Sequence, residues 1–144
     1  SVARSISYLE EESDSISHEN NFVECLRFAF LAKKSKAAIL DLTKWSEKLA
    51  SISRDQQKDF FSYCSYLIRE AMLISYSSKN LGSFSSNTDF KIDKLSPFVH
   101  SSNLIEIISL IEDCHYSISR NVNSKIVFTN FAITLTKLIN KEEV

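Results

Sequence analysis

The chain has 144 residues, of which 44% are apolar, and this is enough for one continuous core but too few for two ordinary domains. We therefore expect a single domain spanning residues 1–144. The 17 basic and 18 acidic residues give a formal net charge of -1, so the chain has no overall positive field to attract a phosphate backbone or an anionic membrane surface. Composition thus argues against free DNA as the main ligand.

The scarcity of glycine and proline predicts an all-α fold. The chain has one residue of each, whereas average usage is about 7% and 5% and both residues punctuate hairpins and turns. Gly82 stands alone between Leu81 and Ser83, so the sequence has no glycine-rich loop whose backbone could approach phosphates closely. This excludes phosphate-loop enzymes.

The first predicted helical stretch ends near residues 33–36. Its apolar side chains recur at intervals of three and four, which places them on one side of a helix: Phe22, Leu26, Ala29 and Phe30. Residues 2–9 are also expected to be helical. The serines and asparagines within residues 13–21 leave a break there as an open alternative, because such side chains compete for backbone hydrogen bonds.

Two further helices are predicted before residue 76. The second has a narrow apolar stripe formed by Ala38, Leu42, Trp45, Leu49 and Ile52. Ser53 and Gln56 have the capping-box spacing and predict the start of the third helix. Its apolar face is wide, so we expect it to be central and contacted on two sides; the face comprises Phe60, Phe61, Tyr63, Cys64, Leu67, Ile68, Ala71, Met72 and Ile74.

The composition of residues 76–89 predicts an exposed loop, and a short apolar element broken by Pro97 follows over residues 90–99. Asn103 and Glu106 predict a capped helix with the stripe Leu104, Ile107, Ile108, Ile111, Cys114 and Ile118. Residues 121–124 cap the last helix, which carries Phe128, Phe131, Leu135, Leu138 and Ile139. The sequence thus predicts one compact bundle of five to six helices.

Catalytic, metal-binding and cofactor-binding patterns are missing from the sequence. His18, His100 and His115 have no partners at metal-ligand spacing, and no serine lies in a nucleophile elbow. We therefore predict no catalytic residue, no metal site and no cofactor. Three separated cysteines in apolar surroundings, Cys25, Cys64 and Cys114, favour buried reduced thiols and hence a cytoplasmic setting.

A few charged residues have more than one interpretation. Lys33, Lys34 and Lys36 favour a solvated helix end, where positive charge complements the helix dipole, over a phosphate-binding patch. Arg69, Glu70 and Arg120 are flanked by apolar residues, so each is either part of a buried or interfacial ion pair or lies at the edge of the core.

Several separated segments carry a resemblance to a known family: Trp45, Leu49, Ala50, residues 54–60, Tyr63, residues 68–70, residues 97–100, Asn103 and, above all, residues 118–128. Together they resemble the C-terminal domain of the delta prime subunit of the bacterial DNA polymerase III clamp loader, of the Bacteroidetes type. The resemblance spans roughly residue 20 to the C-terminus. The family pattern would have Gly at Ser53, Glu at Ser119, Ala at Val122 and Pro at Ser124, and the last departure affects local rigidity while leaving the helix start intact.

The resemblance implies a collar domain that oligomerises with the delta and gamma/tau subunits, while ATPase-like modules lie N-terminal to it. Because the chain starts at Ser1 without an initiator methionine, we expect it to be a piece of a longer protein. The predicted partner-binding residues surround the junction of the last two helices: Arg120, Asn121, Asn123, Lys125, Phe128 and Phe131. The asparagines are expected to cap helices, and the charges either pair internally or face a neighbour.

Two other classes of function remain as alternatives. A small helical enzyme would bring catalytic groups together from distant helices, and it would have a cavity lined by several convergent charges. A nucleic-acid-associated regulatory module would cluster lysines and arginines on one face. An assembly domain would instead expose an apolar strip along one or two helices.

Overall fold

The computed structural model describes residues 2–81 and 99–141, with side chains described for residues 9–74 and 99–141. These ranges contain five α-helices and no strand, which confirms the predicted all-α class. The helices are α1 (Val2–Leu31), α2 (Lys36–Ala50), α3 (Arg54–Leu81), α5 (Leu104–Ser119) and α6 (Ser124–Ile139).

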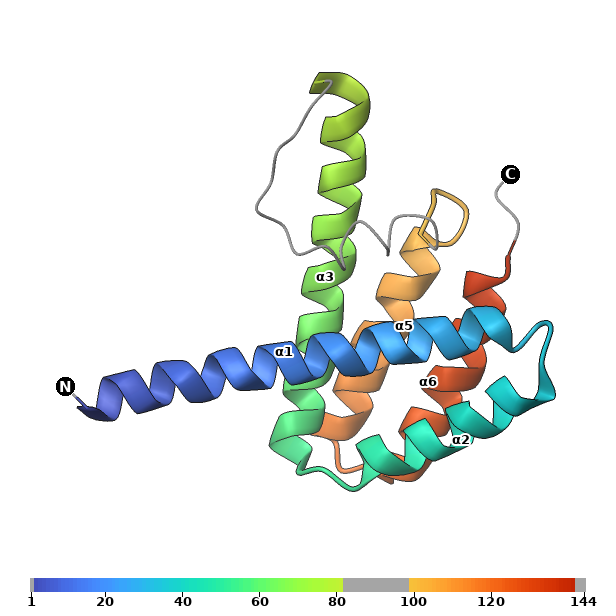
Figure 1. Ribbon diagram of the computed structural model, residues 1–144. Coiled ribbons are helices and arrows are strands. Elements are labelled where there is room, and N and C mark those ends of the chain that lie inside the picture. Colours follow the sequence, from blue (N-terminus) through green and yellow to red (C-terminus); the bar gives the residue numbers. More distant parts are fainter. Residues whose placement is uncertain (1, 82–98, 142–144) are drawn as a thin grey trace.

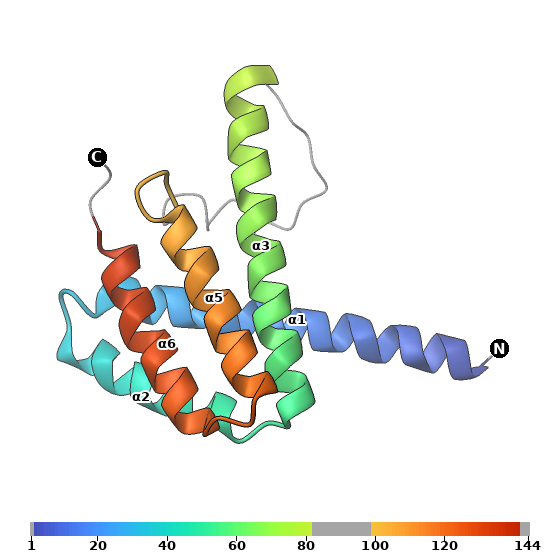
Figure 2. The ribbon, with the colours of Figure 1, turned by 180° about the vertical axis from the view of Figure 1, so that it is seen from behind.

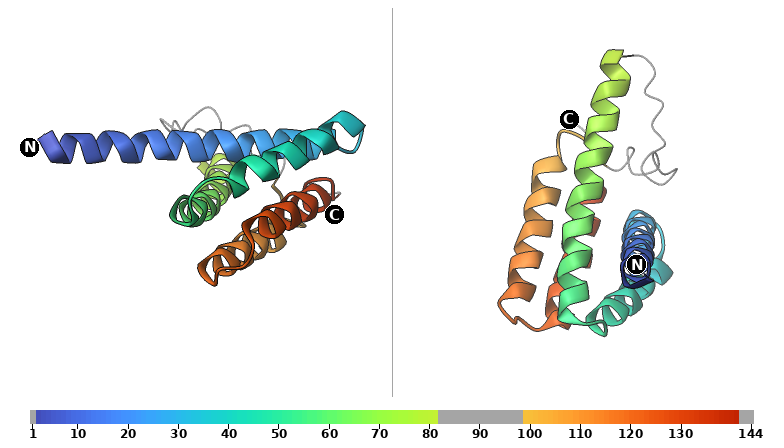
Figure 3. Two further views of the ribbon diagram at one scale, coloured as in Figure 1. Left: turned by 90° about the horizontal axis from the view of Figure 1, so that it is seen from below. Right: turned by 90° about the vertical axis from the view of Figure 1, so that its left-hand side faces the viewer.

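The helices form two layers. Helices α3, α5 and α6 lie side by side in that order (Figure 2), and the hairpin of α1 and α2 covers one face of this row (Figure 3). Helix α1 crosses the row and contacts both α3 and α6, whereas α2 packs along α6. The N-terminal part of α1 and the C-terminal part of α3 extend beyond the rest of the bundle (Figure 1). As predicted, α3 is contacted on two sides, by α1 and by α5.

An aromatic cluster forms the centre of the core, where the two layers meet. The ring of Phe60 on α3 lies 5.9 Å from the rings of both Trp45 and Phe128, and Phe61 stacks on Phe128 at 5.0 Å. Phe131 stacks on Trp45 at 6.0 Å. All five side chains are at most 2% exposed, so burial of large aromatic surfaces from α2, α3 and α6 holds the layers together.

Buried Gln57 connects three elements at one end of the bundle. Its side-chain amide donates to the backbone carbonyls of Leu49, Ala50 and Ile52 at 3.0–3.3 Å, and its Oε1 accepts from the Ser124 hydroxyl at 2.8 Å. These bonds satisfy carbonyls that the end of α2 leaves without helical partners. Ser124 therefore has a structural role at the position where the family pattern would have proline.

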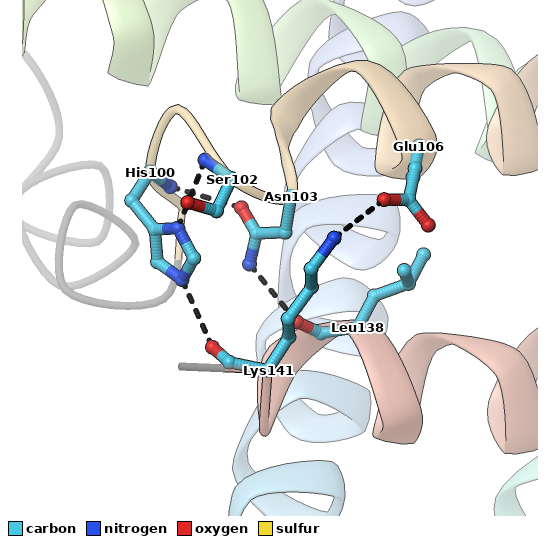
Figure 4. Close-up of polar contacts among 6 residues, drawn as sticks. All are labelled: His100, Ser102, Asn103, Glu106, Leu138 and Lys141. Atoms are coloured by element: carbon cyan, nitrogen blue, oxygen red, sulfur yellow. Dashed lines mark hydrogen bonds and ion pairs between the residues drawn. The ribbon is translucent and has the colours of Figure 1, made fainter. Parts of the chain in front are cut away.

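A second polar cluster joins the start of α5 to the end of α6 at the opposite end (Figure 4). The buried side chain of Asn103 donates to the Leu138 carbonyl at 3.0 Å and accepts from the His100 backbone N–H at 2.9 Å. The His100 ring contacts the Lys141 carbonyl at 3.1 Å, and Lys141 forms an exposed ion pair with Glu106 at 2.8 Å. Asn103 thus connects two helices.

This arrangement differs from the capping role predicted for Asn103. Asn103 occupies the N-cap position of α5, but its side chain forms no capping hydrogen bond. Its amide is engaged by Leu138 and His100, so a tertiary contact replaces the local one. The predicted box at the start of α3 is half formed, because Ser53 Oγ accepts from the Gln56 N–H at 3.2 Å while the Gln56 amide donates to Asp14.

The structure excludes the break that the sequence left open within residues 13–21, and one predicted boundary is wrong. Helix α1 continues through residues 13–21, where His18 is buried with its ring 6.0 Å from that of Phe60, because packing on α3 outweighs the weak local preference for a break. Helix α3 continues to Leu81, so residues 76–81 are helical rather than part of a loop. Residues 82–98, which include most of the predicted short apolar element, lie outside the described residues.

Candidate interaction surface

The predicted partner-binding segment forms the exposed junction between α5 and α6. Asn121 adopts the left-handed conformation, with φ of 63°, and its N–H donates to Ile118 while the Val122 N–H donates to Ser117. This is a Schellman motif, which closes the end of α5. Asn123 caps α6, because its side chain accepts from the Ile126 N–H at 3.2 Å. Both asparagines therefore terminate helices, as predicted.

The two basic residues of the junction contact other residues of the same chain. The Arg120 guanidinium lies 5.4 Å from the centre of the Tyr116 ring and donates to the Tyr116 hydroxyl at 3.1 Å. Lys125 is 3.9 Å from Glu47 of α2, with both side chains more than half exposed. Exposed ion pairs such as Lys125–Glu47 contribute little to stability. Arg120 and Lys125 are both exposed, so both can also contact a partner protein.

Phe128 and Phe131 are not part of this surface, contrary to the sequence prediction. Both are 0% exposed and belong to the aromatic core. Their three-residue spacing places them on one face of α6, and in the structure this face packs into the core. The predicted partner-binding set is thereby reduced to its four polar members.

A cleft of about 330 Å³ lies between α3 and α5, and Arg69 is the charged candidate that lines it. Arg69 pairs with Glu112 at 3.1 Å across the cleft, and both side chains are more than half exposed. His115, Ser62 and Ser65 also line it, but within the described residues neither serine is hydrogen-bonded to His115. Glu70 is half-buried and does not line the cleft. Among the described residues, the cleft thus presents an exposed ion pair and the His115 ring.

An apolar groove with a volume of about 510 Å³ lies between α2 and α6. Ile39 of α2 and Ile133 of α6 are each 54% exposed along it. Sequence reasoning missed this surface, although both isoleucines lie off the buried stripes of their helices. The lining is completed by Ala32, Lys33, Leu42, Thr43, Ser46, Thr129, Ala132, Thr136, Lys137 and Asn140.

Most polar side chains of the groove are turned toward their own backbone. Thr43 donates to the Ile39 carbonyl at 3.2 Å, and Thr136 donates to the Ala132 carbonyl at 2.7 Å. The Ser46 hydroxyl lies within hydrogen-bonding distance of the Leu42 and Phe128 carbonyls. Because these hydroxyls already have acceptors, the groove offers mainly methyl and methylene contacts to a ligand.

Burial shifts the pKa of the three core thiols and of His18. Burial raises the pKa of Cys25 and Cys64 well above the ordinary thiol value, and burial together with the charge of Asp113 raises the pKa of Cys114 to about 12. All three cysteines are free and buried, as predicted. Burial lowers the pKa of His18, and both of its ring nitrogens lack hydrogen-bond partners. The described residues contain no group of side chains suited to hold a metal ion.

No family model, curated protein or solved structure matches this chain. Within the part of the chain that the structure describes, no helix combines the length and apolarity needed to cross a membrane. Among the described residues, the apolar groove between α2 and α6 is the candidate interaction site, because Ile39 and Ile133 are exposed along it.

Proposed function

We propose that this chain is an assembly domain, the collar through which a delta prime subunit of the DNA polymerase III clamp loader packs against the delta and gamma/tau subunits. The observation that carries the proposal is the groove, because its exposed isoleucines lie along two helices. Contiguous apolar surface of this kind is typical of protein-binding sites. Within the described residues, the cleft between α3 and α5 carries an exposed ion pair, whereas the groove presents mainly apolar surface.

The placement of the resembling segments supports the same proposal. Residues 54–60 and 118–128 are distant in sequence, but they meet at one end of the bundle. The Ser124 hydroxyl donates a hydrogen bond to Gln57 Oε1 at 2.8 Å, and the Arg54 guanidinium donates to the Ile118 carbonyl at 3.2 Å. These segments thus act as one framework, which holds the exposed junction of α5 and α6 in a defined position.

In this function the domain supplies proximity and orientation. A collar that holds subunits side by side converts the encounter of their ATPase modules into an intramolecular event with a high effective concentration. ATP chemistry then belongs to those other modules, and the domain itself needs no catalytic residue or cofactor. DNA is contacted only through the complex, and the setting is cytoplasmic.

Co-elution with the candidate partners tests this proposal. The chain is mixed with the delta and gamma/tau collar domains at about 10 μM each, and complexes are resolved by size-exclusion chromatography with light scattering. We expect a discrete complex that contains all three proteins. An unrelated helical bundle of similar size serves as the control. Separate elution of the chain from every clamp-loader protein would refute the assignment to this machine.

A further inference from the structure

We propose that the groove between α2 and α6 binds an amphipathic helix from a neighbouring protein, with the acidic end of that helix over Lys33 and Lys137. This inference deepens the proposed assembly function and rests on it. The occupant is inferred from three properties of the groove, namely its shape, its chemistry and its charge.

The shape fits a helix. The lining residues of α6 extend from Thr129 to Asn140, which corresponds to about 16 Å, or three helical turns. Ile39 and Ile133 are each 54% exposed, so the groove is an open trough rather than an enclosed cavity. A trough of this length accommodates apolar side chains at positions i, i+3 or i+4, and i+7 of a docked helix.

The chemistry favours an apolar contact face over a polar ligand. The hydroxyls of Thr43, Ser46 and Thr136 are hydrogen-bonded to backbone carbonyls of this chain. The Asn140 amide likewise donates to the Ala29 and Thr136 carbonyls. A nucleotide or a polar small molecule would lose water here without gaining hydrogen bonds in return, whereas leucine or isoleucine side chains would gain apolar burial.

The charge of the lining residues indicates that one end of the bound helix is acidic. Lys33 and Lys137 are the charged residues of the lining, and both are exposed. Among the described residues, neither forms an ion pair, and exposed Lys34 and Lys36 follow Lys33 in sequence. One turn beyond the other end, Glu47 and Lys125 lie 3.9 Å apart and compensate each other. The groove is therefore basic at one end, which favours a helix with acidic residues there.

The test uses a defined probe, so it does not depend on clamp-loader proteins. The probe is a fluorescein-labelled helical peptide of about 16 residues, with leucines at three-four spacing and glutamates in one terminal turn. A matched peptide carries lysines in place of the glutamates. Fluorescence anisotropy with the full chain should give about tenfold tighter binding of the acidic peptide at low salt, and this preference should shrink at high salt because ions screen exposed charges.

Matched variants locate the binding site. Ile133→Glu places a charge in the trough at an exposed position and should abolish binding, whereas Ile105→Glu, at a residue 76% exposed on α5, should have no effect. Lys137→Glu should weaken the acidic peptide about tenfold and leave the lysine peptide no weaker. Lys44→Glu, which makes the same change of net charge outside the groove, is its control. Circular dichroism verifies that every variant is folded.

Four outcomes of the peptide and sedimentation experiments would overturn the inference, and a fifth, displacement by an oligonucleotide, would do so as well. The first four are absence of peptide binding, equal binding of the two peptides, binding that survives Ile133→Glu, and a dimer of the chain that Ile133→Glu disrupts in sedimentation. A dimer would assign the groove to a second copy. Displacement of the peptide by a single-stranded oligonucleotide, with dependence on Lys33 and Lys137 but not on Ile133, would instead assign the basic end to nucleic acid. None of these outcomes alters the co-elution test, so the two proposals can fail separately.

Discussion

Replacement of Gln57 by alanine should destabilise the domain more than any other change of a polar residue at that end of the bundle. Its amide has two N–H donors shared among three carbonyls, and its oxygen accepts from Ser124. The two donated hydrogen bonds and the one accepted hydrogen bond contribute about 1 kcal/mol each, so their loss should lower the free energy of unfolding by about 3 kcal/mol. For a chain of this length, the melting temperature should fall by about 6–12 °C.

Gln56→Ala is the matched control, because the two glutamines are adjacent on α3. The Gln56 amide forms one exposed hydrogen bond, to Asp14 at 3.2 Å, so its removal should change the free energy of unfolding by no more than about 0.5 kcal/mol. Urea unfolding followed by circular dichroism measures both variants. Equal stabilities of Gln57→Ala and Gln56→Ala would refute the role assigned to the buried amide.

A double-mutant cycle isolates the contact between Gln57 and Ser124. Ser124→Ala removes one partner of the 2.8 Å hydrogen bond, and in the double variant neither partner is left unsatisfied. We expect a coupling free energy of about 1 kcal/mol. Strict additivity of the two single changes would show that the hydroxyl contributes nothing through Gln57.

Three further predictions concern the core and the opposite end of the bundle. Burial lowers the pKa of His18, so the unfolded state binds a proton at higher pH than the folded state, and the free energy of unfolding should fall as the pH drops below about 6.5. In His18→Phe, the free energy of unfolding measured with urea should depend less on pH between about pH 7.5 and 5. An unchanged pH dependence would contradict this. Asn103→Ala should cost about 1–3 kcal/mol in thermal and urea unfolding because it removes the buried hydrogen bonds of the Asn103 side chain to the Leu138 carbonyl and the His100 N–H, whereas removal of the exposed Glu106 carboxylate should cost less than about 1 kcal/mol. Burial raises the pKa of all three thiols, so Cys25, Cys64 and Cys114 should resist alkylation by iodoacetamide at pH 8 until urea unfolds the chain. Mass spectrometry measures the alkylation, and rapid labelling of the folded chain would place a thiol at the surface.

Local patterns in the sequence were sufficient to predict the helices and much of the core. The stripe from Ala38 to Leu49 is buried on α2, and Asn123 caps α6 as its position suggested. Such signals are local, because three-four spacing and capping depend on residues within one or two turns. The same reasoning could not separate an inward from an outward role for Phe128 and Phe131, since an apolar side chain suits both a core and an interface.

The candidate groove depended on tertiary structure. Ile39 and Ile133 are 94 positions apart in the numbering, and only the packing of α2 along α6 brings them to one surface. Likewise, Asn103 satisfies the conditions for a local cap, but Leu138 provides a competing acceptor that no neighbouring residue reveals.

The sequence by itself thus determined the helical class, the buried stripes and the helix ends at Asn121 and Asn123, because these follow from short-range hydrogen bonding and apolar periodicity. Tertiary structure alone decided which apolar residues remain exposed and which lysines stand beside them. A binding surface is formed by side chains from separate helices, and their proximity is a property of packing.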